Sequence, residues 1–213
     1  GSSPTSTRGN SNGVDLNRSY PHPMQYISTL EPEIAAMINF VDQHNFAVSA
    51  NFHGGAELAN YPWDGWDSQE HIHADDAWWQ YVCRSYADSC QYYGNASYFN
   101  DQNDGITNGG DWYVVYGSRQ DYLNYYAGCR ELTVEISSYK TPSASNLPYY
   151  WNANKNSLLN YIEESLYGFR GLVFDAYSEA PLNAEIFVNQ HDEMNTQVYS
   201  HLPIGNYHRP IKA

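Results

Sequence analysis

The chain has 213 residues, and 24 Asp and Glu against 10 Lys and Arg give a formal net charge of −14 at pH 7. Hydrophobic residues make up 42% of the chain, which is enough for a packed core and excludes wholesale disorder. Nucleic acid is not an expected partner, because phosphate binding needs clustered Lys and Arg. No apolar run approaches the roughly 20 residues of a membrane span. The length suits one domain, or one domain and part of a second.

Apolar residues recur at two different spacings along the first 168 residues. Ile34, Met37 and Val41 have helical spacing, whereas Val134 and Ile136 alternate with polar residues as in a strand. The pattern predicts, in chain order, a loop at 1–13, a helix at 31–45, a strand at 46–52, a helix at 75–93, loops at 95–110 and 117–126, a strand at 132–137 and a helix at 154–167. Strands that alternate with helices indicate an α/β fold.

The character of the chain changes after Gly168. Two short β-prone runs, 171–176 and 184–190, are separated by a Pro-containing turn, and we expect no further helix before Ala213. We therefore place a domain boundary here, with an α/β domain at 1–168 and part of a small all-β module at 169–213. About 45 residues is short for a module that folds alone.

Of the three cysteines, Cys83 and Cys90 lie in the second predicted helix and are not expected to form a disulfide there. Cys83 and Cys90 are seven residues apart, which is roughly 10 Å along a helix axis and too far for a disulfide. We interpret them as small, buried, apolar residues.

Four segments carry residues suited to chemistry: 8–21 (RGNSNGVDLNRSYP), 49–64 (SANFHGGAELANYPWD), 117–126 (GSRQDYLNYY) and 131–137 (ELTVEIS). Arg8, Asn17 and Arg18 offer planar donors for a carboxylate or an oxyanion. His53 follows an apolar strand, where α/β sheets place their ligands. Glu135 lies on the polar face of a strand, and a low-dielectric setting there would raise its pKa as a general base requires. Surface arginines, a structural histidine and a solvated edge strand are the alternatives.

In this order and spacing, the four segments resemble the zinc metallocarboxypeptidases of the funnelin type, closest to the regulatory carboxypeptidase N/E, D and M subfamily. The resemblance extends through WNANKNSLLNYIEESLYGFRGLVFD and covers nearly the whole chain. It implies a mixed sheet flanked by helices, followed by part of a small all-β transthyretin-like module. It also implies one zinc ion, peptide or protein C-termini as partners, and a secreted or periplasmic location. The oligomeric state is left open.

The resemblance implies catalytic roles for three residues. His53 corresponds to the third zinc ligand of the family. Glu135 corresponds to the general base and acid that acts on the zinc-bound water. Arg8 corresponds to the arginine that polarises the scissile carbonyl.

Further residues correspond to the family's substrate-binding positions. These are Asn17 and Arg18 at the terminal carboxylate, Tyr125 as the tyrosine that closes over the substrate, and Asp64 and Gln120 in the pocket for the last side chain. An inserted residue after Tyr122 leaves Tyr126 as an alternative to Tyr125. A carboxylate at position 64 favours substrates that end in Lys or Arg.

The sequence departs from the family pattern at the metal site. None of its eight histidines has Glu three residues later, so the H-x-x-E motif with the first two zinc ligands is not found. We expect the two further ligands upstream of this sequence, and the chain to be truncated at both ends. The stretch alone is then expected to be inactive and not to bind catalytic zinc tightly, since such sites use three protein ligands.

Four other interpretations remain open. The segment 71–76 (HIHADD) resembles a local metal site, although charged residues that open a helix are the commoner explanation. The 21 Tyr and 6 Trp residues suit a carbohydrate-binding module, and the many carboxylates suit a glycosidase. Neither of these two explains the ordered set of Arg, Asn, His and Glu. A catalytically dead relative of the carboxypeptidases would explain it.

Overall fold

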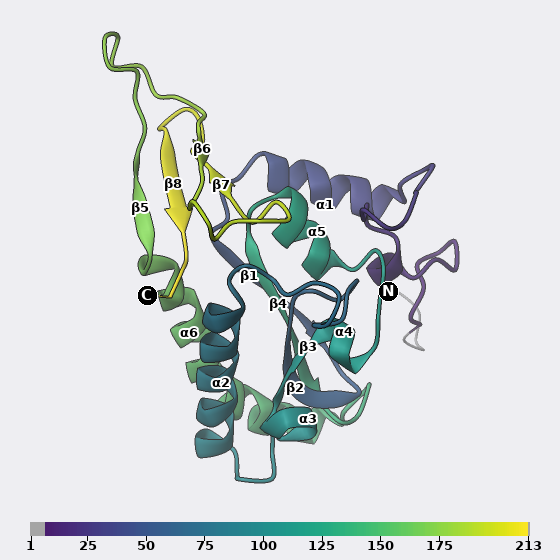
Figure 1. The fold of residues 1–213 in the computed structure, drawn as a ribbon. Helices are drawn as coiled ribbons and strands as arrows, with labels where there is room; N and C mark the ends of the chain where they lie inside the picture. The colour runs from purple at the N-terminus through teal and green to yellow at the C-terminus, as the bar shows by residue number, and fades with distance from the viewer. Residues whose placement is uncertain (1–6, 213) are drawn as a thin grey trace.

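The structure is a computed structural model that describes residues 7–212, so the first six residues of the predicted loop lie outside it. A four-stranded mixed sheet forms its centre, in the order β1-β4-β2-β3 (Figure 1). The strands are β1 (Val48–His53), β2 (Ala56–Tyr61), β3 (Ile106–Asn108) and β4 (Arg130–Ser137). Strand β4 runs parallel to β1 and antiparallel to β2, and β2 runs parallel to β3. The predicted α/β class with a mixed sheet is confirmed.

Three long helices match the predicted ones. They are α1 (Pro32–Asp42), α2 (Asp76–Tyr93) and α6 (Leu147–Glu163). Helix α6 begins before the predicted residue 154, since Pro148 suits a first helical turn. The shorter elements are η1 (Leu16–Arg18), α3 (Asp101–Asp104), α4 (Gly109–Trp112), α5 (Arg119–Tyr126), η2 (Ala144–Asn146) and η3 (Glu164–Leu166).

The predicted loops at 95–110 and 117–126 are wrong as continuous loops. The first contains α3 and β3, and β3 is held in the sheet by its pairing with β2. The second is helix α5, whose N-terminal Ser118 Oγ accepts the Asp121 amide at 3.2 Å. The polar, Tyr-rich composition hides this helix because its stability comes from packing against β4 rather than from an apolar stripe. Strand β2 was not predicted.

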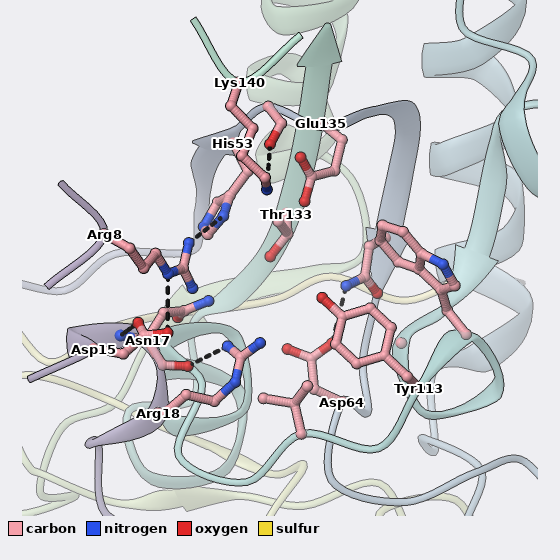
Figure 2. Close-up of a pocket in the computed structure, with 15 residues that line it drawn as sticks. Arg8, Asp15, Asn17, Arg18, His53, Asp64, Tyr113, Thr133, Glu135 and Lys140 are labelled. Atoms are coloured by element: carbon pink, nitrogen blue, oxygen red, sulfur yellow. Dashed lines mark hydrogen bonds and ion pairs between the residues drawn. The ribbon is translucent and has the colours of Figure 1, made fainter. Parts of the chain in front are cut away.

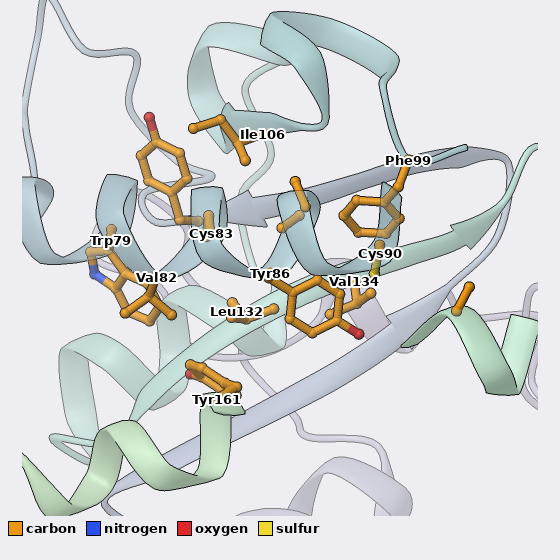
Figure 3. Close-up of a cluster of buried hydrophobic side chains, with 14 of the residues drawn as sticks. Trp79, Val82, Cys83, Tyr86, Cys90, Phe99, Ile106, Leu132, Val134 and Tyr161 are labelled. Carbon is orange, nitrogen blue, oxygen red and sulfur yellow. The ribbon is translucent and has the colours of Figure 1, made fainter. Parts of the chain in front are cut away.

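The main core lies between one face of the sheet and the helices α2 and α6 (Figure 3). Trp79 and Tyr86 of α2 pack with Leu132 and Val134 of β4 and with Tyr161 of α6. Because side chains alternate along a strand, the neighbouring residues of β4 point to the opposite face. That face carries the candidate site.

The C-terminal part forms two small antiparallel sheets. Strand β5 (Phe169–Leu172) pairs with β8 (Asn206–Arg209), and β6 (Glu185–Ile186) pairs with β7 (Val198–Tyr199). Both predicted strands are therefore shorter than expected, and β7 and β8 were not predicted. Within the described residues no helix follows η3.

All three cysteines are buried and unpaired, which confirms the interpretation of Cys83 and Cys90 as buried residues. Among residues 7–212, no helix combines the length and apolar character needed to cross a bilayer.

Candidate active site

A cavity of about 310 Å³ opens where the parallel strands β1 and β4 reach their carboxyl ends (Figure 2). Six of the residues singled out from the sequence line it: Arg8, Asn17, Arg18, His53, Asp64 and Glu135. They come from three of the four segments, 8–21, 49–64 and 131–137, which are far apart in the chain. The fold therefore brings most of the predicted set to one place.

Glu135 and His53 are neighbours because β1 and β4 pair in register at these two residues. Glu135 is only 8% exposed, and its Oε2 atom is buried without a hydrogen-bond partner. Burial raises the pKa of Glu135, although Lys140 and Arg8 act in the opposite direction. A carboxylate with a raised pKa and a free oxygen is suited to accept and return a proton.

Arg8 lies over His53 at the rim of the cavity. Its Nη1 atom is 3.5 Å from His53 Nδ1, and its Nε donates to Asp15 Oδ2 at 2.9 Å. Burial, and then the charges of Arg8 and Arg18, lower the pKa of His53 to about 4. The imidazole is therefore neutral at pH 7, which is the form that binds metals.

The short helix η1 presents two donors to the same cavity. Asp15 caps it, since its Oδ1 accepts the Asn17 amide at 3.0 Å. The side-chain oxygen of Asn17 accepts the Arg119 amide at 2.9 Å, which leaves the NH₂ end of Asn17 as a donor. Arg18 Nη1 donates to the Asn17 carbonyl at 2.7 Å, and this is one of five guanidinium N–H groups. The pair can accordingly bind a carboxylate.

Asp64 forms the buried acidic wall of the cavity. Its Oδ1 accepts hydrogen bonds from Asn60 Nδ2 at 2.9 Å and from Gln120 Nε2 at 3.1 Å. Burial and the neighbouring Asp121 raise the pKa of Asp64 to about 7. Gln120 is fully buried and does not line the cavity, so it acts on the cavity only through Asp64.

Tyr125 is not among the residues that line the cavity. It packs against Trp63, with ring centroids 6.0 Å apart, and against Tyr126 at 4.9 Å. Tyr126 does not line the cavity either, whereas Tyr113 does. The position of Tyr125 in this structure therefore gives no support to the role expected of it.

Several residues that line the cavity were not predicted from the sequence. Lys140 reaches the cavity beside Glu135, and its Nζ donates to the Gly54 carbonyl at 3.2 Å (Figure 2). Trp112 and Tyr113 form part of the wall. The signal for Lys140 was its position shortly after the strand that carries Glu135, in a chain with few basic residues.

The described residues of the cavity do not by themselves fit a catalytic zinc ion. His53 is the one imidazole among the lining residues, and a catalytic zinc normally has three protein ligands. In the part of the chain that the structure describes, the only cluster of three possible ligands is Asp75, His191 and Asp192, away from the cavity. Its two carboxylates are bound by arginines, which makes it an ion-pair cluster.

The predicted alternative of a metal site at 71–76 is not supported. His73 is buried, its Nδ1 accepts the Asp75 amide at 3.0 Å, and burial lowers its pKa to about 3. His71 is exposed. The two histidines therefore lie in different environments.

Comparison with known proteins identifies the family of the chain. The zinc carboxypeptidase family matches residues 3–157. Carboxypeptidase SOL1 of Arabidopsis thaliana is 36% identical over 210 residues, which cover 95% of this chain and 42% of that protein. Human carboxypeptidase D is 39% identical over 209 residues, covering 88% and 15%, and mouse carboxypeptidase M is 34% identical over 219 residues, covering 94% and 47%.

The chain belongs to the zinc carboxypeptidase family, and its curated relatives include carboxypeptidases D, M, N and SOL1. The crystal structure of carboxypeptidase A from Helicoverpa armigera has the same fold, with a TM-score of 0.54 at 14% identity over 73% of this chain and 43% of that one. The chain spans less than half the length of the curated relatives named here.

Proposed function

We propose that this chain forms the substrate-binding part and carries the general base of a metallocarboxypeptidase that favours C-terminal Lys or Arg. The observation that carries the proposal is the convergence of carboxylate-binding donors, a buried general base and a buried acidic wall on one cavity. Its volume lies at the lower end of the range for ligand pockets, which suits one terminal residue better than a long peptide.

The proposed chemistry follows from the positions of the side chains. Asn17 and Arg18 bind the terminal carboxylate, and Asp64 pairs with the basic side chain of the last residue. Glu135 takes a proton from the attacking water and returns it to the leaving amine. Arg8 donates to the oxygen that becomes negative in the transition state.

The finer features of the proposal rest on the resemblance to the family. We propose that zinc is the metal and that His53 supplies one of its ligands, as the neutral imidazole allows. Residues 1–168 and 169–213 are proposed as two domains, the second a partial transthyretin-like module, consistent with two small antiparallel sheets. Secretion or export to a periplasm is proposed on the same basis.

The test uses the full-length protein and peptides that differ only in their last residue. We expect peptides ending in Lys or Arg to be cleaved faster than those ending in Leu. The same peptides with an amidated C-terminus serve as controls and should resist cleavage, because Asn17 and Arg18 then lack a carboxylate to bind. A chelator should abolish cleavage and zinc should restore it.

Three results would contradict the proposal. Cleavage that a chelator does not affect would exclude a metallopeptidase. Equal cleavage after Arg and Leu would remove the specificity assigned to Asp64. Peptide binding without any cleavage by the zinc-loaded protein would favour a catalytically dead relative.

A further inference from the structure

A second buried carboxylate lies directly behind the Asp64 wall. Asp121 of α5 is 1% exposed, and both of its oxygens bind the backbone that carries Asp64. Its Oδ1 accepts the Asp64 amide at 2.8 Å, and its Oδ2 accepts the Gly65 amide at 2.8 Å. Asp121 is itself held at the start of α5 by Ser118. Two parts of the chain that are 57 residues apart are thereby joined behind the cavity.

His22 holds Asp121 from the other side. Its Nε2 atom is 3.3 Å from Asp121 Oδ2, and its Nδ1 accepts the Met24 amide at 3.1 Å. Because Nδ1 accepts the Met24 amide, Nε2 is the ring nitrogen that can donate to Asp121. Asp121 therefore receives a hydrogen bond from His22.

The surrounding packing leaves His22 little freedom. Its ring lies 4.7 Å from the ring of Trp66 and 5.2 Å from that of Tyr116. A Cβ atom at Gly65 would overlap His22 Nε2, and one at Gly109 would overlap Asp64 Oδ1. Glycine at these two positions gives both polar side chains the space they occupy.

We propose that Asp121 and His22 are positioning residues of the specificity pocket. They fix Asp64 through its backbone, and they make the binding of a basic side chain by Asp64 depend on the charge of Asp121. The proposal rests on the proposed function, since it assumes that Asp64 binds the last side chain of the substrate. Neither residue touches the cavity, so both act through Asp64.

Electrostatics supports the proposed dependence of Asp64 on the charge of Asp121. Burial and then the charge of Asp121 raise the pKa of Asp64 to about 7. The groups that oppose this shift are the hydrogen bonds from Ser118 and Asn60 and the charge of Arg18 across the cavity. Gln120 donates to the same carboxylate, and the ring of Tyr113 lies beside it (Figure 2). The wall therefore loses its negative charge as the pH falls through neutrality.

The experiment measures, in the full-length protein, the ratio of kcat/KM for a peptide ending in Arg to that for one ending in Leu, from pH 5.5 to 8.5. The ratio cancels titrations that affect both peptides, such as that of Glu135. For a single group with a pKa near 7, the ionised fraction changes about tenfold between pH 8 and pH 6. We expect the ratio to fall about tenfold over this range in the wild type.

Variants of the two positioning residues should change this profile in different ways. Asp121→Asn removes the second negative charge, so the midpoint of the ratio should move about one pH unit lower or more. His22→Leu removes the donor and should lower the ratio at pH 8 about fivefold, and His22→Gln, which keeps a neutral donor, should restore most of it. Asp192→Asn removes a buried carboxylate outside the pocket and should leave the midpoint unchanged.

An NMR titration of the Asp64 side-chain carboxyl carbon in the wild-type protein provides a readout that needs neither turnover nor a folded variant. We expect a midpoint near pH 7. A midpoint below pH 5, or a ratio that Asp121→Asn does not shift, would overturn the inference while leaving the proposed function intact. A wild type that cleaves Arg and Leu peptides equally at every pH would instead overturn the proposed function.

Discussion

The Asp75→Asn substitution tests how the C-terminal part of the chain is held to the α/β part. Asp75 is 2% exposed, at the start of α2. Its carboxylate accepts one hydrogen bond from Arg130 Nε and two from Arg209, each at 2.8 Å. His191 Nε2 also lies 2.8 Å from Asp75 Oδ1. Arg209 also pairs with Asp192. One carboxylate thus joins β4 of the sheet to β8 and to the segment before β7.

The expected loss of stability follows from the burial of this cluster. Removing one partner of a buried ion pair costs about 3–5 kcal/mol, because the remaining charge is left uncompensated. Here Arg130 and Arg209 are both completely buried, so neither can turn to water. A domain of this size has a total stability of about 5–15 kcal/mol, and the substitution would therefore remove a large share of it.

The loss of stability caused by Asp75→Asn should depend on pH in one direction. Burial alone would raise the pKa of Asp75, but Arg130 and Arg209 outweigh it and hold the pKa well below its ordinary value. A carboxyl with a depressed pKa stabilises the fold above its unfolded pKa of about 3.9, and this contribution is lost as the pH falls further. The difference between wild type and Asp75→Asn should therefore be largest near pH 7 and shrink below about pH 4.

Urea unfolding followed by tryptophan fluorescence measures the free energy, and limited proteolysis of residues 169–213 measures local release. The matched control is Asp76→Asn, since Asp76 is adjacent and partly buried, and its side chain accepts a hydrogen bond from Gln80 rather than from the arginines. The control should change stability by less than about 1 kcal/mol. Equal losses in the two variants, or a loss at position 75 that does not depend on pH, would refute the reasoning.

Three further outcomes test the proposed site and the core. Glu135→Gln should lower kcat of the full-length enzyme by about 10²–10⁴-fold with zinc content unchanged, and a loss of zinc would show that its role was mistaken. Asp64→Ala should weaken cleavage after Lys or Arg more than after Leu, and equal losses would remove the specificity argument. Burial raises the pKa of Cys90 and of Cys129 to about 12. These two cysteines and the buried Cys83 should therefore react with a thiol reagent only after unfolding. Rapid labelling of the native protein would contradict the core described here.

The elements that could be predicted from sequence are those whose own periodicity is strong. Helix α2 and strand β4 carry regular apolar residues that face a single core, so the local pattern and the tertiary structure agree. Strand β2 is different, because five of its six residues are buried and its segment therefore lacks a clear alternation. Helix α5 lacks an apolar stripe, although the pair Ser118 and Asp121 was a readable start signal.

The candidate site was predictable where a motif places a residue directly on the cavity. His53 ends β1 and Glu135 lies near the carboxyl end of β4, and the pairing of these two strands places the two residues side by side. The supporting residues were not predictable, because their role depends on distant contacts. His22 meets Asp121 across 99 residues, and no local spacing indicates that meeting.

The distribution of the few basic residues suits the proposed binding of a peptide carboxylate by an acidic chain. Arg8, Arg18 and Lys140 line the cavity, while Arg130 and Arg209 are buried against Asp75. The net charge of −14 favours the approach of a basic side chain but disfavours that of a carboxylate. Charges more than about 8–10 Å away are largely screened at physiological salt, so the local cations decide the orientation of the bound terminus. In the proposed function, the substrate carboxylate is drawn to the cationic side of the cavity and the basic side chain to the Asp64 side. This requires the two kinds of charge to stay separated within one small pocket.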